Sequence, residues 1–240
     1  MKSKIISLAS MVIALGSVFM AAFFPRLARS LRKRGLQTTI SLFIIKVKLT
    51  IDLFLPRTIW GERVGLRLIN QSLTRAEVER VYKWSCDREI LRWSAGSPTE
   101  LNFDEFSDQL KRQRWHLQLN QRVFYIVLPT GELIGKIGLY SIDWMLKQGE
   151  LGIFLDQMYW GKQYGRDAIK ILVKYAFTKT PLTRIFLGTF KQNLRAQRSF
   201  AACGFNLIGT ADRYNPIVEK NEEGVVMEIL RGDFNISSKY

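Results

Sequence analysis

The chain has 240 residues, of which 47% are hydrophobic and 24% charged, and its formal net charge is +15. This composition is that of a folded globular protein and excludes a low-complexity or largely disordered chain. Residues 1–51 hold nine Lys or Arg and no Asp or Glu, which leaves 27 of the 36 basic residues against 21 acidic ones in the remainder. Because much of the basicity lies in the N-terminal segment, the sequence argues against nucleic-acid binding by the main domain.

Residues 5–24 form an uncharged stretch of 20 residues, which as a helix covers about 30 Å, the thickness of a bilayer core. Basic residues flank it on both sides, and residues 1–34 are therefore expected to contact an anionic membrane surface. We favour a membrane anchor, and the heavier positive flank after the span predicts that the rest of the protein stays in the cytoplasm. A cleaved secretory signal needs a pattern of small residues at its cleavage site, and none is present near Ala21. The third interpretation is an amphipathic or organelle-targeting segment.

Residues 45–53 alternate between apolar and polar side chains, which is typical of a strand with one covered face or of a segment lying along a membrane. Pro56 ends the pattern. We predict an N-terminal extension over residues 1–60 and a folded domain over residues 61–240. The two cysteines, Cys86 and Cys203, have no CxxC spacing, and the lone His116 has no partner, so neither a metal site nor a disulfide framework is predicted.

The main domain alternates between strand and helix patterns. A strand is predicted at 64–69, and the pairs Thr74/Glu77 and Asn102/Glu105 have the spacing of capping boxes at two helix starts. Later helices are predicted at 166–177 and 194–202, and later strands at 123–128, 133–142, 150–155, 184–190, from 204 and at 225–230. Such a mixture of hairpins and crossover helices predicts an α/β sheet with parallel and antiparallel pairs.

One segment, residues 151–168, runs from an apolar strand through a glycine-containing loop into an amphipathic helix. Free N–H groups and the positive end of the helix dipole bind phosphate groups at such a helix start. Gly161 and Gly165 permit close approach of a ligand, and Lys162 and Arg166 add positive charge. Taken alone, the same pattern also fits an ordinary strand-to-helix turn.

Four blocks in order make residues 64–231 resemble the GNAT superfamily of N-acetyltransferases, and within it the RimJ/RimL-like group. The first block is the Trp-rich end of a helix, and the second is a hairpin of the form Gly-x-x-Ile-Gly-x-x-x-Leu. The third is the glycine loop, and the fourth reads Asn-x-x-Ala followed by Gly-Phe. These blocks occupy residues 82–93, 131–139, 150–168 and 193–205. The resemblance implies a mixed, centrally splayed β-sheet flanked by helices.

The resemblance also implies acetyl-CoA as co-substrate and direct attack by a primary amine on the thioester, without a covalent enzyme intermediate. It implies that the pantetheine arm pairs with the strand around Ile153 and Leu155, and that Glu150 is the candidate general base, although a lone carboxylate there also fits a solvated surface position. The acceptor, a protein N-terminus or a small amine, stays open. The remaining cofactor-binding candidates are Trp160, Gly161, Lys162, Gln163, Tyr164, Gly165, Arg166 and Asn193.

The sequence departs from the family pattern in two places. Trp160 stands where the family loop usually has an arginine or glutamine. Gln163 stands where it usually has its first glycine. Phe200 stands where many members have a tyrosine that acts as the acid, and a phenyl ring has no proton to give. An alternative hypothesis is therefore a membrane-tethered acyl-CoA-binding or interaction module with eroded catalysis.

Overall fold

The computed structural model of the protein describes residues 58–69, 72–113 and 120–234. The chain divides into two units, residues 1–49 and 50–240, and every described residue belongs to the second. The predictions for the apolar stretch 5–24, its basic flank, the alternating residues 45–53 and His116 lie outside the described residues.

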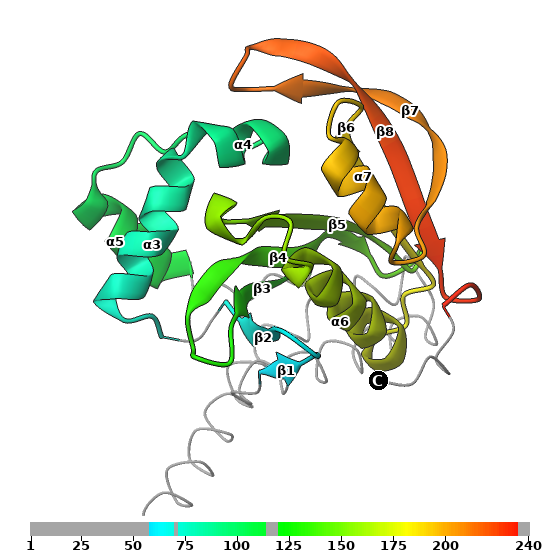
Figure 1. The fold of residues 1–240 in the computed structure, drawn as a ribbon, viewed down its shortest axis with the longest axis horizontal. Helices are drawn as coiled ribbons and strands as arrows, with labels where there is room; N and C mark the ends of the chain where they lie inside the picture. Colours follow the sequence, from blue (N-terminus) through cyan, green and yellow to red (C-terminus); the bar gives the residue numbers. More distant parts are fainter. Residues whose placement is uncertain (1–57, 70–71, 114–119, 235–240) are drawn as a thin grey trace, which may run out of the picture. The chain divides into compact units, whose positions relative to one another are not determined.

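The described part of the chain contains one sheet of eight strands in the order β1-β2-β3-β4-β5-β6-β8-β7 (Figure 1). Only the β5–β6 pair is parallel, and the other neighbours are antiparallel. The sheet is therefore mixed, as predicted. The strands are β1 Ile59–Trp60, β2 Gly65–Leu68, β3 Arg122–Val127, β4 Leu133–Asp143, β5 Gln148–Leu155, β6 Arg184–Phe190, β7 Asn206–Asn215 and β8 Lys220–Leu230.

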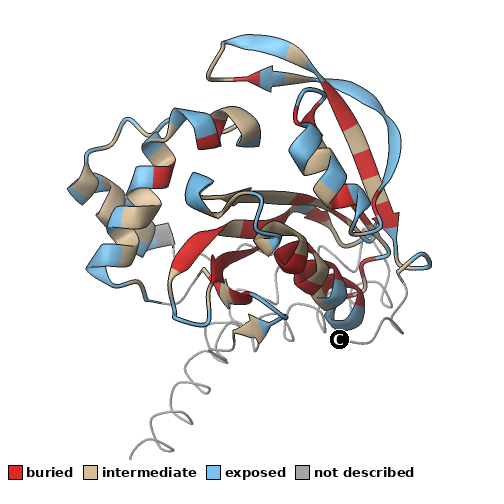
Figure 2. Cartoon of the chain, viewed as in Figure 1, coloured by how far each residue is buried: buried red, intermediate tan, exposed pale blue. Residues whose placement is uncertain are grey.

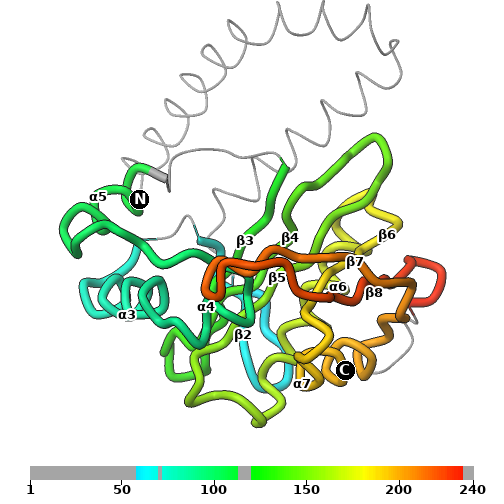
Figure 3. The backbone as a smooth tube through the Cα atoms, turned by 90° about the horizontal axis from the view of Figure 1, so that it is seen from above, coloured from blue at the N-terminus to red at the C-terminus, as the bar shows by residue number. Residues whose placement is uncertain are grey.

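Five α-helices and one 3-10 turn accompany these strands in the described ranges. Figures 1 and 3 both show α3 and α5 gathered to one side of β5, and β6 on the other. The longest helix, α6, has 16 residues, and no helix in the described ranges is long and apolar enough to cross a membrane. The helices are α3 Arg75–Cys86, α4 Arg88–Ser94, α5 Phe103–Gln113, α6 Tyr164–Lys179 and α7 Leu194–Ala201, and the turn η1 is Gln157–Tyr159.

Both predicted capping boxes are present. The Thr74 hydroxyl accepts a hydrogen bond from the Glu77 N–H at 3.3 Å, and the Glu77 carboxylate accepts one from the Thr74 N–H at 2.8 Å. Asn102 and Glu105 exchange the same two bonds at 3.0 Å each. Each box satisfies N–H groups that a helix start leaves without a partner, so α3 and α5 begin where the sequence predicts.

Helices pack on both faces of the sheet. Neighbouring residues of a strand point to opposite faces, so each strand supplies side chains to both. Phe124 of β3 packs against Tyr175 of α6, with ring centroids 5.6 Å apart. On the other face, Trp84 of α3 packs at 5.6 Å against Phe154 of β5 and shares a buried cluster with Tyr125. Figure 2 colours much of the α6 ribbon as buried, and eight of its residues are buried. Two apolar clusters, one on each face, therefore hold the sheet between α6 and the α3–α4 pair.

The sheet opens at its centre. Strands β5 and β6 pair only at Gln148/Arg184, Gly149/Ile185 and Glu150/Phe186. Beyond that point β5 runs on to Leu155 and β6 to Phe190 with no pairing between them. This confirms the predicted splay.

Helix α4, which the sequence analysis did not separate from α3, lies beside the opening and contacts both β5 and β6. It starts at Asp87, whose carboxylate accepts bonds from the N–H groups of Glu89 and Ile90. At its far end the Arg92 carbonyl accepts a bond from the Asn215 amide at 3.5 Å. A helix of seven residues makes about two turns, too few for its apolar period to be recognised in a sequence.

Candidate active site

Two adjoining cavities occupy the opening between β5 and β6. We call the larger one, of about 540 Å³, the sheet cavity, and the other, of about 450 Å³, the loop cavity. Phe154, Asn193 and Phe200 are among the residues that line both, so the two form one continuous cleft. It leads from the start of α6 to the point where β5 and β6 separate.

The loop cavity contains most of the predicted cofactor-binding residues. Lys162 and Tyr164 do not line it: the Lys162 ammonium lies 5.6 Å above the Tyr159 ring, and the Tyr164 ring packs 6.1 Å from that same ring. The predicted residues that line the loop cavity are Ile153, Leu155, Trp160, Gly161, Gln163, Gly165, Arg166 and Asn193.

The start of α6 keeps the backbone shape that a glycine would give. Gln163 adopts a left-handed conformation with φ of 65°, and Gly161 has φ of 75°. The Gln163 side chain is exposed and makes no capping hydrogen bond, so it leaves the first N–H groups of α6 open toward a ligand. The departure from the family's glycine therefore changes the side chain and preserves the loop geometry, at a cost of about 1–2 kcal/mol for the left-handed backbone.

The loop before α6 is fixed by side-chain hydrogen bonds. Asp156 accepts one from the Trp84 indole at 2.9 Å and one from the Met158 N–H at 3.2 Å. The Trp160 indole donates to the Leu155 carbonyl at 2.8 Å. The loop is thereby tied both to α3 and to the end of β5, which gives the cavity a preformed wall.

Two arginines of α7, which are not among the predicted site residues, also line the loop cavity. The Arg195 guanidinium stacks on the Trp160 ring at 3.4 Å, and Arg198 lines the same wall one helical turn later. These arginines supply positive charge near Trp160, the position where the family loop usually has a charged or amide residue. Their spacing of three residues, directly after Asn193, is the signal that was available in the sequence.

Asn193 serves first as a helix cap. It is 7% exposed, and its side-chain oxygen accepts a hydrogen bond from the Ala196 N–H at 3.2 Å, which fixes the start of α7. Its position in the lining of both cavities is therefore determined by the cap.

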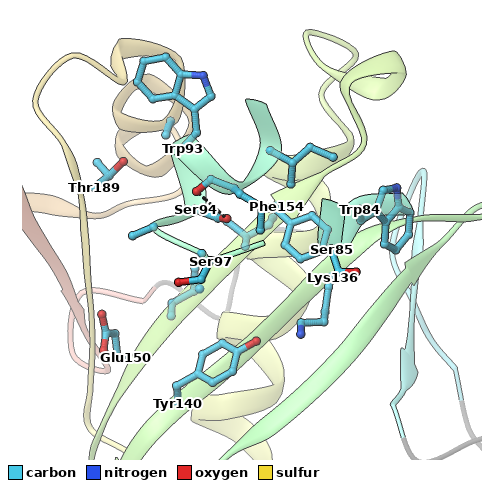
Figure 4. Close-up of a pocket in the computed structure, with 18 of the residues that line it drawn as sticks. Trp84, Ser85, Trp93, Ser94, Ser97, Lys136, Tyr140, Glu150, Phe154 and Thr189 are labelled. Atoms are coloured by element: carbon cyan, nitrogen blue, oxygen red, sulfur yellow. Dashed lines mark hydrogen bonds between the residues drawn. The ribbon is translucent and has the colours of Figure 1, made fainter. Parts of the chain in front are cut away.

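Glu150 lies at the fork itself, in the last residue pair that joins β5 to β6, and lines the sheet cavity (Figure 4). Its Oε1 atom is 4.0 Å from Nη1 of Arg213, and both side chains are about one third exposed. Arg213 reaches this point from β7 by passing over Gly188 and Gly224, where any side chain would collide with it. Phe200, by contrast, is buried, packs against Phe205 at 5.9 Å and brings no proton donor to the cleft.

Comparisons with known proteins agree with this geometry. The acetyltransferase (GNAT) domain family matches residues 67–206. The chain is 26% identical over 140 residues to spermidine N(1)-acetyltransferase of Vibrio cholerae, covering 58% of this chain and 79% of that protein. It is 30% identical over 185 residues to N-acetyltransferase p20 of Bacillus licheniformis, covering 74% and 98% of the two chains.

Among solved structures, spermidine N-acetyltransferase of Vibrio cholerae in complex with CoA and spermine matches with a TM-score of 0.62. The identity is 25%, and the match covers 71% of this chain and 96% of that one. These findings confirm the predicted fold, enzyme class and co-substrate. The chain belongs to the acetyltransferase (GNAT) domain family and is an acetyl-CoA-dependent N-acetyltransferase.

Proposed function

We propose that this enzyme transfers the acetyl group directly to a primary amine held in the sheet cavity, with Glu150 as the general base. The observation that carries the proposal is the fork. The part of β5 that has separated from β6 begins there, and the only carboxylate among the described residues that line either cavity lies there. An acetyl group delivered along β5 from the loop cavity would reach an amine beside Glu150.

In the proposed complex, the pantetheine arm lies along the free edge of β5 at Ile153 and Leu155. The pyrophosphate lies on the N–H groups of residues 161–166, where the helix dipole and the nearby arginines favour negative charge. The backbone of Lys162 and Tyr164 belongs to this cradle, although their side chains point elsewhere. Trp160 and Asn193 complete the walls.

The proposed reaction forms a bond between the amine nitrogen and the acetyl carbon and breaks the bond between that carbon and sulfur. The amine proton passes to the Glu150 carboxylate, directly or through one water. The CoA thiolate then takes its proton from water, because Phe200 has none to give. We expect this last step to slow the enzyme relative to family members that have a tyrosine there.

A continuous assay of free CoA thiol, with the full-length protein and a panel of amines and peptides, tests this proposal. Glu150→Gln keeps the size of the side chain and removes the base, so kcat should fall about 100-fold or more while acetyl-CoA affinity stays unchanged. If Glu150→Gln retains the wild-type kcat, Glu150 is not the base. Tight acetyl-CoA binding without acetylation of any acceptor would favour the interaction-module alternative.

The acceptor class is part of the proposal. Two relatives act by name on spermidine, and a protein N-terminus is the acceptor that the resemblance to the RimJ/RimL-like group implies. A panel of polyamines, amino acids and N-terminal peptides separates these classes by kcat/KM.

We also propose that the N-terminal extension contacts a membrane through residues 1–34 and leaves the folded domain in the cytoplasm. The support is the uncharged stretch 5–24 and the basic residues around it. Flotation of the full-length protein with vesicles of anionic phospholipid tests this. Equal recovery with and without residues 1–34 would overturn it.

A further inference from the structure

A row of three side chains crosses the floor of the sheet cavity. Lys136 of β4 is paired with Tyr125 of β3 on one side and with Phe154 of β5 on the other. Directly paired residues point to the same face of a sheet, and all three line the sheet cavity. The row therefore places one ammonium group on the floor, beneath α3 and α4.

This ammonium has no partner among the described residues. Lys136 is half-buried, and no described residue forms an ion pair or hydrogen bond with its Nζ atom. Burial without a counter-charge lowers the pKa of the Lys136 ammonium. A cation that is partly removed from water and left without a counter-charge is destabilised, so its position in a cavity points to an anion that completes it.

The tyrosines next to Lys136 differ in how their hydroxyls are placed. The Tyr125 hydroxyl is buried and has no hydrogen-bond partner in the described structure. The Tyr140 ring leans over Gly152, whose lack of a side chain makes room for it, and Figure 4 shows Tyr140 and Lys136 pointing into the same space. Burial raises the pKa of Tyr140 to about 12 and also raises that of Tyr125, so both hydroxyls remain protonated donors.

The cavity offers little to a second cation. Glu150 is the only carboxylate in the described lining of the sheet cavity, and it already faces Arg213. A diamine or polyamine that placed one amine at Glu150 would bring another ammonium toward Lys136. Like charges in a partly dehydrated cavity repel strongly, because the effective dielectric constant there is well below that of water.

We propose that the acceptor is an amine that also carries a carboxylate, which Lys136 binds with the Tyr140 hydroxyl while the amine lies at Glu150. This inference rests on the proposed function, because it takes Glu150 as the acetylation end of the cavity. Glu150 and Phe154, the strand partner of Lys136, are four residues apart on β5, or about 13 Å. The lysine side chain reaches over part of this distance. The acceptor is thus an ω-amino acid or a short peptide, with its two charges separated by several bonds.

The test uses three amines of equal length with the full-length enzyme: 5-aminopentanoate, 1-aminopentane and 1,5-diaminopentane. The wild type should favour 5-aminopentanoate over the diamine by at least tenfold in kcat/KM. Lys136→Met should lower kcat/KM for 5-aminopentanoate at least tenfold. It should change kcat/KM for 1-aminopentane by less than threefold. Lys136→Arg should restore most of the loss, and Lys179→Met, at an exposed lysine of α6, is the matched control.

Calorimetric titration of the CoA-loaded protein with pentanoate, which has no amine, separates this proposal from the catalytic one. Binding of pentanoate that Lys136→Met abolishes supports the anion site even if no amine is acetylated, and in that case the proposed catalysis fails instead. The anion site is overturned if pentanoate does not bind, or if the diamine is the best acceptor and Lys136→Met affects all three amines equally.

Discussion

Arg213 and Glu150 meet across the opening of the sheet, with Nη1 of the first 4.0 Å from Oε1 of the second. They come from β7 and β5, which are separated in the sheet by β6 and β8. The arginine side chain passes over the two glycines on β6 and β8, and it places a positive charge beside the proposed base.

We predict that Arg213→Met lowers kcat three- to tenfold with a smaller effect on KM, because it removes the positive charge that faces the Glu150 carboxylate. Arg213→Lys keeps the charge and should recover part of the loss. Steady-state kinetics with a single acceptor measure both. An unchanged kcat in Arg213→Met would show that the contact is incidental.

We predict that Gly165→Trp abolishes acetyl-CoA binding and leaves the protein folded. A Cβ atom at this position would lie 3.4 Å from Leu155 Cδ1, an ordinary contact, so Gly165→Ala is the control that should bind normally. The larger indole would instead fill the loop cavity, which Gly165 lines. Calorimetric titration measures affinity, and circular dichroism verifies folding. Unchanged affinity in the tryptophan variant would contradict the proposed placement of the phosphates.

We predict that Arg195→Ala weakens CoA binding five- to thirtyfold, equivalent to about 1–2 kcal/mol, because it removes both a positive charge and the stack on Trp160. Arg195→Lys keeps the charge and loses the flat stacking surface, so its affinity should lie between the two. Titrations at low and high salt separate the two contributions. If the alanine variant binds CoA as tightly as the wild type, α7 does not contribute to the cofactor site.

We predict that Asp167→Ala destabilises the protein by about 2–4 kcal/mol. The buried Asp167 carboxylate of α6 accepts hydrogen bonds from the N–H groups of Glu62, Arg63 and Val64 at 3.3, 2.8 and 3.0 Å. Urea unfolding measures the change, and Asp167→Asn should lose less because one acceptor remains. The exposed Asp108, which pairs with Lys111, is the control site whose replacement by alanine should not move the midpoint.

The sequence predicted those elements whose signals are local. The capping residues before α3 and α5 and the apolar period of α6 were sufficient, because each depends on residues within a few turns. Strand β8 begins at Lys220, earlier than the predicted 225, because its first residues are polar and only their pairing with β7 makes them a strand.

The polar groups of the cleft were harder to predict for a different reason. Glu150 follows a recognisable motif order, but Lys136, Tyr140 and Arg213 are brought to it by strand register and by glycines on other strands. Register depends on the whole sheet, so no local pattern marks these residues. The stack of Arg195 on Trp160 likewise joins two segments that only the fold brings together.

The opening between β5 and β6 has a consequence for the empty enzyme. Residues 151–155 of β5 and 187–190 of β6 do not pair with each other, so each strand has a free edge there. A free strand edge is a site where a second chain can add a strand. A bound pantetheine arm would occupy this place like a short guest strand. Saturation with CoA is therefore expected to protect the purified protein from aggregation as well as from unfolding.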